Sequence, residues 1–326
     1  MSQNAVLDVY FLLLPHSLIL DWAGPAEALR MANDVLQEQG KPARFRLHYI
    51  SPLPQTESSV GVAIAGLQPL PDTLPSPSWV VLVGQPGPTI SVDDAYTRSA
   101  IDWLAGLTLR SGALELLAIC AGTVLAAHAG LLNGRRATTH HQHLEELQAV
   151  APQCQVISNR VFVEDAPVFS SAGVTTGLDL MLHRIGTLCG PALAAQVAQT
   201  MVVAMRRGPQ DPELSPFLAY RNHLHPALHR VQDAIGNAPA HPWNLDSMAD
   251  IAHTSPRHLT RLFVEHAQVA PLAYLRQIRL AVAQSALRSG RNVTQAAELA
   301  GFSSDTQLRR AWRQFGANGT PSQHQA

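Results

Sequence analysis

A single cysteine stands where a short apolar run ends and a helical pattern begins. Residues 115–119 read ELLAI, Cys120 follows, and Ala121 and Gly122 come directly after it. Small residues after a cysteine let a chain turn sharply from a strand into a helix, which is how many enzymes hold a nucleophile above a sheet. Cys120 is therefore either a catalytic thiol or part of a ligand site in a protein with another activity.

Three histidines follow within two dozen residues: His140, His141 and His143. Adjacent histidines point in different directions on a helix or a strand, and no cysteine or carboxylate completes the set at metal-ligand spacing. We therefore expect no metal here. Such a cluster is typical of a surface or of a helix start, and we expect no cofactor.

A second set of chemically capable residues lies in a repeat near the end of the chain. SPRHLTRLF (255–263) aligns without gaps with SDTQLRRAW (304–312). Each copy has a serine that can cap a helix, a leucine four residues later, then an arginine and an aromatic residue at steps of two. A short helical pattern and a tight turn precede each copy, so the pattern predicts two helix-turn-helix units.

Long polar donors lie on one side of each repeated helix and large apolar residues on the other. The residues expected to face inward are Leu259, Leu262, Phe263, Leu308 and Trp312. Arginine suits phosphates and the edge of guanine, and glutamine suits adenine, so the outward side is suited to DNA. The candidate DNA contacts are Arg257, Thr260, Arg261, Thr306, Gln307, Arg309 and Arg310. We expect some of these arginines to touch phosphate only.

The charge distribution agrees with that interpretation. From residue 216 onward the chain has eleven arginines against six acidic residues, a net charge of +5, while the rest carries −6. A basic C-terminal part joined to an acidic N-terminal part indicates that the C-terminal part binds a polyanion.

The elements that must position Cys120 alternate along residues 5–200. Apolar runs predict strands, and amphipathic stretches between them predict helices, including residues 22–40 and 94–107. The predicted strands are VLDVYFLLL, FRLHYIS, WVVLVG and ELLAIC, followed by a late hairpin of RVFVED and VFSSAG. Two closing helices are predicted at 177–190 and 191–205. This alternation predicts an α/β fold: a doubly wound sheet with helices on both faces, followed by an all-α tandem helix-turn-helix domain.

Composition sets the domain count and the compartment. With 326 residues, 46% hydrophobic and 14% charged, the chain is long and apolar enough for two globular domains. RRGPQDPELSPFL (206–218) is rich in proline, so we place domains at 1–205 and 223–326 with a linker at 206–222. Three scattered cysteines suit a reducing compartment. The first apolar run lacks a basic flank, and no stretch reaches the length of a membrane span, so we expect a cytoplasmic protein without membrane contact.

The basic third of the chain resembles a known family. SPRHLTRLF, PLAYLRQIRLAVAQSAL and AGFSSDTQLRRAWRQFG make residues 223–316 similar to the AraC/XylS DNA-binding domain. The resemblance implies two helix-turn-helix units in successive major-groove faces of an operator, with the seven candidate contacts above. It also implies transcriptional regulation, more often activation, with RNA polymerase as a further partner. The family's usual closing motif is absent after Pro321.

The front domain resembles the sensor domain of the GlxA-like branch of that family. This domain is similar to the class I glutamine-amidotransferase superfamily, which includes the Parkinsonism-associated deglycase and intracellular proteases. In DWAGPAEAL the resemblance puts Glu27 beside the cysteine, in VGQPG it puts backbone oxyanion donors at Gly84 and Gln85, and in RRATTH it puts His140 near the thiol. If the domain is an enzyme, Glu27, Cys120 and His140 are its catalytic residues, with the thiol activated by the helix expected to start at Ala121. The protease members have histidine where Ala121 stands.

Two hypotheses follow. In the first, which we favour, the front domain is not an enzyme and binds a small metabolite, which the resemblance suggests is an amino acid or a quaternary amine. The expected ligand pocket comprises Asp21, Glu27, Gly84, Gln85, Cys120, Ala121 and His140. Asp21 is equally suited to capping a helix that begins at Trp22. In the second, the front domain is a cysteine-dependent amidase or deglycase fused to a DNA-binding domain; a variant of the first makes Cys120 a redox switch. We expect a homodimer, because regulators of this kind meet repeated half-sites.

Overall fold

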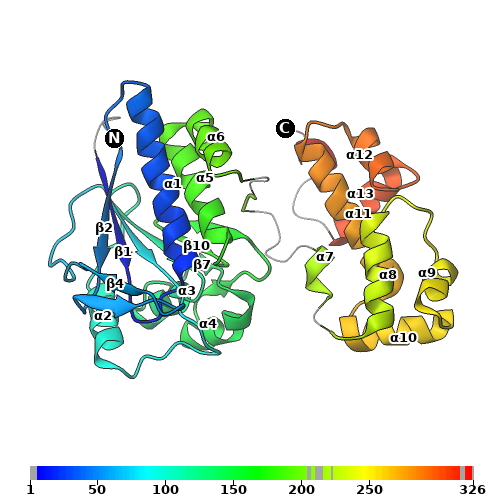
Figure 1. Ribbon diagram of the computed structural model, residues 1–326, viewed down its shortest axis with the longest axis horizontal. Coiled ribbons are helices and arrows are strands. Elements are labelled where there is room, and N and C mark those ends of the chain that lie inside the picture. The colour runs from blue at the N-terminus through cyan, green and yellow to red at the C-terminus, as the bar shows by residue number, and fades with distance from the viewer. Residues whose placement is uncertain (1–5, 204–206, 210–215, 222, 316–319, 325–326) are drawn as a thin grey trace. The chain divides into compact units, whose positions relative to one another are not determined.

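The chain divides into two compact units, Met1–Glu213 and Leu214–Ala326. The computed structural model describes residues 6–203, 207–209, 216–221, 223–315 and 320–324. Figure 1 shows a sheet flanked by helices in the first unit and an assembly of helices in the second. The border lies inside the predicted linker, of which residues 206, 210–215 and 222 are outside the described residues.

The first unit alternates strands and helices. Its elements are β1 (Leu7–Leu12), α1 (Ile19–Glu38), β2 (Phe45–Ile50), β3 (Gln55–Glu57), β4 (Ala63–Ala65), β5 (Ser78–Leu82), α2 (Ala95–Ala105), β6 (Leu114–Ile119), α3 (Gly122–His128), β7 (Arg136–Ala137), the 3-10 turn η1 (His141–His143), α4 (Leu144–Val150), β8 (Gln155–Val156), β9 (Phe162–Asp165), β10 (Val168–Ser171), α5 (Thr176–Cys189) and α6 (Pro191–Thr200).

The central sheet has the strand order β2-β1-β5-β6-β10-β9. All neighbours are parallel except β9, which pairs antiparallel with β10 at one edge. The four predicted strands and the predicted late hairpin are confirmed. The carboxyl ends of β1, β5, β6 and β10 therefore meet at one edge of the sheet, where α/β proteins of this topology bind ligands.

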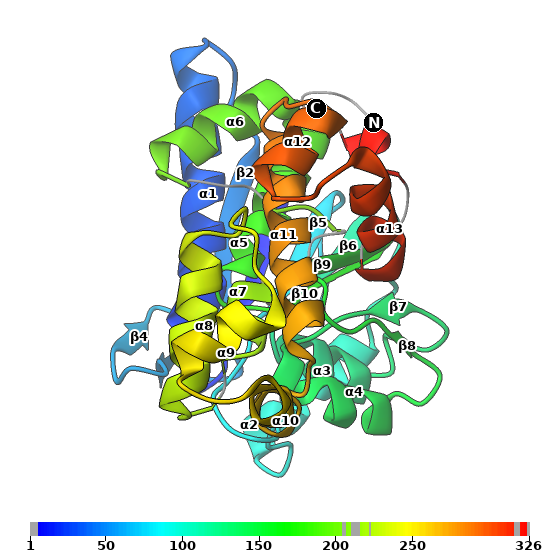
Figure 2. The same ribbon diagram turned by 90° about the vertical axis from the view of Figure 1, so that its right-hand side faces the viewer.

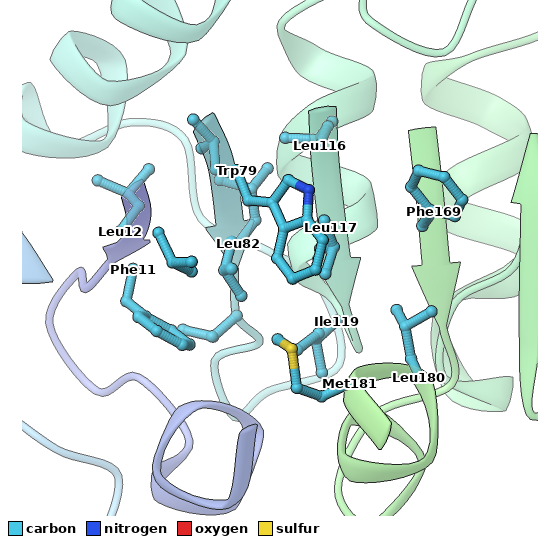
Figure 3. Packing of buried hydrophobic residues seen from close by; sticks show 14 of the residues in the cluster. Phe11, Leu12, Trp79, Leu82, Leu116, Leu117, Ile119, Phe169, Leu180 and Met181 are labelled. Atoms are coloured by element: carbon cyan, nitrogen blue, oxygen red, sulfur yellow. The ribbon is translucent and has the colours of Figure 1, made fainter. Parts of the chain in front are cut away.

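The apolar runs of the strands are buried because helices flank the sheet. Every residue of β1 and of β5 is buried, and Figure 3 shows side chains of β1, β5, β6 and β10 packing toward Leu180 and Met181 of α5. Helices α1, α5 and α6 pack on one another, and α3 packs against β5 and β6. A Cβ on Gly122 would lie 2.7 Å from the carbonyl carbon of Leu82, so glycine is what lets α3 approach β5 so closely.

The second unit is built of helices in its described part. Its elements are α7 (Pro216–Ala219), α8 (Pro226–Asn237), α9 (Leu245–Ala252), α10 (Pro256–Ala267), α11 (Pro271–Arg288), α12 (Val293–Leu299), α13 (Asp305–Phe315) and the 3-10 turn η2 (Pro321–His324).

Two small hydrophobic clusters organise this unit, and α11 belongs to both. Tyr274 and Ile278 of α11 are buried with α8, α9 and α10, while Leu280 and Leu287 are buried with α12 and α13. Figure 2 shows α11 running past α8 and α12. The pairs α9–α10 and α12–α13 confirm the two predicted helix-turn-helix units, and α11 confirms the long helix predicted between them.

The turn between α12 and α13 also touches the segment between α8 and α9 directly. Gly301 has φ +78°, and a Cβ there would lie 2.5 Å from the Cα of Ala240. Arg279 of α11 donates to the carbonyls of Pro239 and His241 at 2.9 and 2.7 Å. These contacts fix the 239–241 segment against α11 and against the turn between α12 and α13.

Several predicted helix boundaries differ from the observed ones by a few residues. Helix α1 begins at Ile19 rather than Trp22, α3 begins at Gly122 rather than Ala121, and α6 ends at Thr200 within the predicted 191–205. Residues 204 and 205 of that prediction lie outside the described residues. None of the described helices has the length and apolarity needed to span a membrane.

Candidate functional site

The cysteine at the end of β6 lies in the sharp turn that the sequence predicts. Cys120 has φ +57°, a left-handed conformation that is uncommon outside glycine. Its N–H donates to the carbonyl of Ser171 at 3.0 Å, so the turn is tied to the end of β10. Only 4% of Cys120 is exposed.

Two glycines enclose the thiol. A Cβ on Gly84, just after β5, would lie 2.9 Å from the Sγ of Cys120, and a Cβ on Gly173, just after β10, would lie 2.6 Å from it. Real Cβ atoms do not approach this closely, so both positions require glycine. The thiol is thus packed between the loops that follow β5 and β10, the two strands on either side of β6.

The carboxylate beside this thiol belongs to Asp21, in the first turn of α1. Its Oδ2 accepts the N–H of Gly84 at 2.9 Å, and its Oδ1 accepts the N–H of Val174 at 2.7 Å. The Cys120 side chain is also hydrogen-bonded to it. Burial raises the pKa of Asp21 to about 6, although these three hydrogen bonds act in the opposite direction. Asp21 therefore joins the loops after β5, β6 and β10.

We predict that Asp21 makes the first unit less stable as the pH rises from 5 to 7. Its pKa is higher in the folded than in the unfolded chain, so its favourable contribution is complete below about pH 4 and is lost as the pH passes about 6. The loss between pH 5 and 7 is about 1 kcal/mol. Urea unfolding of wild type and of Asp21→Asn at both pH values measures it, and parallel pH profiles for the two would contradict the prediction.

The expectation that Glu27 lies beside the cysteine is wrong. Its carboxylate is paired with Arg30 at 2.7 Å and both side chains are 51% exposed. The position on the thiol is occupied by Asp21. The expected role of Asp21 as the cap of α1 is also wrong, because Leu18 is the N-cap and Asp21 is already helical. The resemblance pointed to the correct helix but to a carboxylate about 1.7 turns further along it.

The expectation that the Gly84 N–H is a free oxyanion donor is wrong as well, because this N–H already donates to Asp21. The side chain of Gln85 donates to the carbonyl of Pro15 at 2.7 Å and is partly exposed. Ala121 is buried at the start of α3. Of the expected pocket, Asp21, Gly84, Cys120 and Ala121 are therefore buried together.

The segment that holds His140 is joined to the cysteine turn by the residue before it. Thr139 Oγ1 donates to the Cys120 carbonyl at 2.8 Å. The His140 ring lies 4.2 Å from that of His141, and His143 Nδ1 contacts Glu146 at 2.7 Å. Burial, together with the neighbouring histidines, lowers the pKa of His140 to about 4, so its ring is neutral at physiological pH. Within the described ranges, no group of three or more His, Cys, Asp or Glu side chains is arranged to hold a metal ion.

Gly173 and Val174 are site residues that sequence reasoning missed. They follow β10, whose carboxyl end lies beside that of β6. The signal was available in VFSSAG, because a glycine after a parallel strand next to the cysteine strand is a candidate for close approach.

The second candidate site consists of the outward sides of α10 and α13. Ser255 and Ser304 cap these helices, with their Oγ atoms accepting the N–H of His258 and of Gln307 at 3.3 Å. The five residues expected to face inward are buried, as predicted. Helical periodicity therefore turns the candidate DNA contacts outward.

The candidate contacts differ in how free their side chains are. Those that are exposed are Arg257, Arg261, Thr306, Gln307, Arg309 and Arg310. Thr260 is partly buried and its Oγ1 donates to the carbonyl of Pro256 at 2.9 Å, and Gln307 Oε1 accepts the N–H of Ser303 at 3.4 Å. Thr260 thus has its donor in use, whereas Gln307 keeps its amide donors.

Three arginines of this unit make contacts within it. Arg221 pairs with Asp233 at 2.6 Å, Arg230 donates to carbonyls at the end of α9, and Arg279 holds the 239–241 segment. Arg230 is exposed nevertheless, as are the other eight of the eleven. The basic surface is thus carried mainly by α10, α13 and the end of α11.

Comparison with known proteins agrees with the two-unit organisation. The DJ-1/PfpI family matches residues 81–186, and a helix-turn-helix domain family matches residues 248–325. The first unit includes a fold like that of a ThiJ/PfpI family protein from Pseudomonas syringae, with TM-score 0.54, 18% identity, and coverage of 72% of this chain and 88% of that one.

Two curated relatives bear on the activity. The isonitrile hydratase of Pseudomonas putida is 28% identical, with 63% of this chain and 81% of that protein covered. The HTH-type transcriptional regulator CdhR of Pseudomonas aeruginosa is 31% identical, with 98% of this chain and 91% of that protein covered. A relative of this identity, matched across both units, settles the family. The chain belongs to the AraC-type family of HTH transcriptional regulators that carry a DJ-1/PfpI domain ahead of their helix-turn-helix domain.

Proposed function

We propose that this regulator recognises a promoter operator through α10 and α13, and that a small metabolite bound near Cys120 alters that recognition. The proposal of operator binding rests on α10 and α13, two serine-capped helices whose apolar sides are buried and whose arginines are exposed. Each helix is suited to one major groove, and both are held on the single helix α11.

The contacts of Cys120 favour a sensor over an enzyme. The Cys120 side chain is committed to a hydrogen bond with the buried Asp21 carboxyl, which also binds the amides of Gly84 and Val174. The Gly84 amide is occupied by the same carboxylate, and His140, with a pKa of about 4, is a weak base. A cysteine nucleophile needs a thiolate, a base and free oxyanion donors.

The effector would approach the partly exposed members of the expected pocket. Gln85 and His140 are partly exposed, and the Asp21–Cys120 pair lies buried. A polar nitrogenous metabolite suits the Asp21 carboxylate at this end of the sheet. A thermal-shift screen of amino acids, quaternary amines and polyamines on the full chain tests this, since a ligand that binds the folded protein raises its melting temperature by mass action. A positive compound should then change the affinity of the protein for genomic fragments that it selects, and a screen without any positive compound would contradict the sensor.

A cysteine-dependent activity is the second candidate, favoured by the similarity to isonitrile hydratase and by the strained turn at Cys120. We predict that Cys120→Ala binds the selected DNA fragments within about threefold of wild type, because Cys120 lies in the other unit. We also predict that wild type shows no amidase, deglycase or hydratase turnover. Gel-shift titration and product assays measure the two results. Turnover that Cys120→Ala abolishes would make the front domain an enzyme.

We further propose a cytoplasmic homodimer that contacts RNA polymerase when bound to its promoter. Two subunits would present four helices to repeated half-sites, which raises affinity without new contacts in either subunit. Sedimentation of the full chain with and without operator DNA tests the dimer.

A further inference from the structure

An arginine six residues before the border between the two units is bound to the N-terminal part of α5. Arg207 donates from Nε and from a terminal nitrogen to Oδ2 of Asp179, at 2.9 and 2.6 Å, and its backbone N–H donates to Oδ1 at 3.0 Å. The terminal nitrogen also reaches Thr175 Oγ1 at 2.8 Å. The side chain of Asp179 is 6% exposed and that of Arg207 is 26% exposed. This is a multidentate ion pair anchored on a buried carboxylate, which is the strong kind.

Thr175 and Asp179, which accept the hydrogen bonds of Arg207, belong to the same short segment that contacts Cys120. We call residues 173–179 the β10–α5 segment. At its start, Gly173 packs on the thiol and Val174 donates its N–H to Asp21. Thr176 donates both its N–H and its Oγ1 to the Gly173 carbonyl, at 3.0 and 2.9 Å. The segment is therefore one hydrogen-bonded turn, with the Cys120 site on one side and Arg207 on the other.

We propose that Arg207 is a latch that couples the Cys120 site to the chain leading into the DNA-binding unit. This inference rests on the proposed sensing function and adds the route by which sensing would act. A ligand that competes for Asp21, or that needs the space beside Gly173, displaces Val174 and with it the turn that presents Thr175 and Asp179. The latch then loses its geometry, and Arg207 loses these contacts with Thr175 and Asp179.

The contacts indicate that a displacement of Val174 would reach Asp179 and Arg207 instead of being taken up within the turn. The turn from Gly173 to Thr176 is closed by two hydrogen bonds, so its ends move together rather than independently. Asp179 accepts three hydrogen bonds from Arg207. Because this carboxylate is buried, replacing Arg207 with bulk water as its partner is energetically costly. The proposal therefore assigns this segment two states, the latched one seen here and a released one, and a ligand biases the balance between them.

The first test is independent of DNA and of any effector. The full chain is treated with N-ethylmaleimide and the labelling rate of each cysteine is followed by peptide mass spectrometry. We expect Arg207→Ala and Asp179→Asn to raise the rate at Cys120 by about tenfold, because the segment that covers the thiol opens more often. Cys154 and Cys189 report on general unfolding and should keep their rates. The control is Arg98→Ala, which removes an exposed arginine of α2.

A Cys120 rate in Arg207→Ala equal to that of wild type would overturn the latch. So would an equal rise at all three cysteines, because it would mean that Arg207 only stabilises the unit as a whole.

The second test asks whether the latch carries the signal. The maleimide adduct on Cys120 serves as the occupant of the site, and DNA fragments selected by wild type serve as the ligand. We expect labelling to change the Kd of wild type for these fragments by about tenfold, within the usual range of coupling between sites. It should change the Kd of Arg207→Ala and of Cys120→Ala by less than about twofold.

Two outcomes of the second test are separable. If labelled Arg207→Ala shifts as far as labelled wild type, the signal does not pass through Arg207 and the inference is overturned. If wild type shows no sequence preference on DNA at all, the proposed function fails, and the labelling rates still decide whether Arg207 holds the segment.

Discussion

The double variant Arg261→Ala, Arg310→Ala is expected to lose most of its sequence-specific DNA binding while remaining folded. Each side chain is exposed on the outward side of its helix, and each helix packs in its own hydrophobic cluster. A bidentate arginine–base contact contributes about 1–3 kcal/mol of discrimination, and contacts on separate helices add approximately. The double variant should therefore lose about 2–6 kcal/mol of operator affinity.

Gel-shift titrations of both single variants and of the double variant on selected and scrambled fragments measure this effect. A matched control is Arg288→Ala, which removes an exposed arginine from the end of α11 without touching α10 or α13. Loss of affinity that is equal on selected and scrambled DNA would show that Arg261 and Arg310 contact phosphate only. A loss in the control as large as in the variants would contradict the placement of the interface on α10 and α13.

The basic charge counted in the sequence mixes two kinds of arginine that only the structure separates. Arg230 and Arg279 donate to backbone carbonyls within the unit, and no local pattern marks them as different from Arg257 or Arg261. The repeat nevertheless identified the correct helices, because a gap-free alignment of caps and apolar positions carries three-dimensional information about which side of each helix is buried.

The sheet was predictable because each parallel strand is a nearly continuous apolar run between turn residues, which is a strong signal. The cysteine turn was predictable for a local reason too, since ICAG places small residues where a sharp turn needs them. The segments that were missed, such as β3 and β7, are two or three residues long and carry no period that a sequence pattern can detect.

The choice between Asp21 and Glu27 could not be made from local sequence. Asp21 is selected by the amides of Gly84 and Val174, which lie 63 and 153 residues away along the chain. The start of α1 was misplaced for a related reason. Its N-cap is Leu18, which has no side chain able to accept a hydrogen bond, so Asp21 looked like the better cap. The bond between Arg207 and Asp179 is equally non-local.

The α5 helix that carries Asp179 is also fixed at its other end by a buried ion pair. Arg184 contacts Glu115 of β6 at 2.5 Å and lies 3.9 Å from the centre of the Phe169 ring. Glu115 additionally accepts the indole N–H of Trp79 and the N–H of Gly112, both at 2.9 Å. Burial lowers the pKa of Arg184, an effect that the nearby carboxylates, Glu115 first, oppose. The pair therefore ties α5 to β5 and β6 near the amino end of β6, whereas Cys120 follows its carboxyl end.

Arg184→Ala should consequently destabilise the first unit by about 3–5 kcal/mol, because it leaves the Glu115 carboxylate buried without its cation. Replacing both partners with Arg184→Met and Glu115→Gln should cost less, since no charge is then buried and the indole still has an acceptor. Urea unfolding followed by tryptophan fluorescence measures both variants. If the single and double variants lost the same stability, packing rather than charge would be what Arg184 contributes. A single variant that unfolds at the wild-type urea concentration would show that α5 is held by its apolar side alone, and the latch at Arg207 would then have to work without a fixed far end.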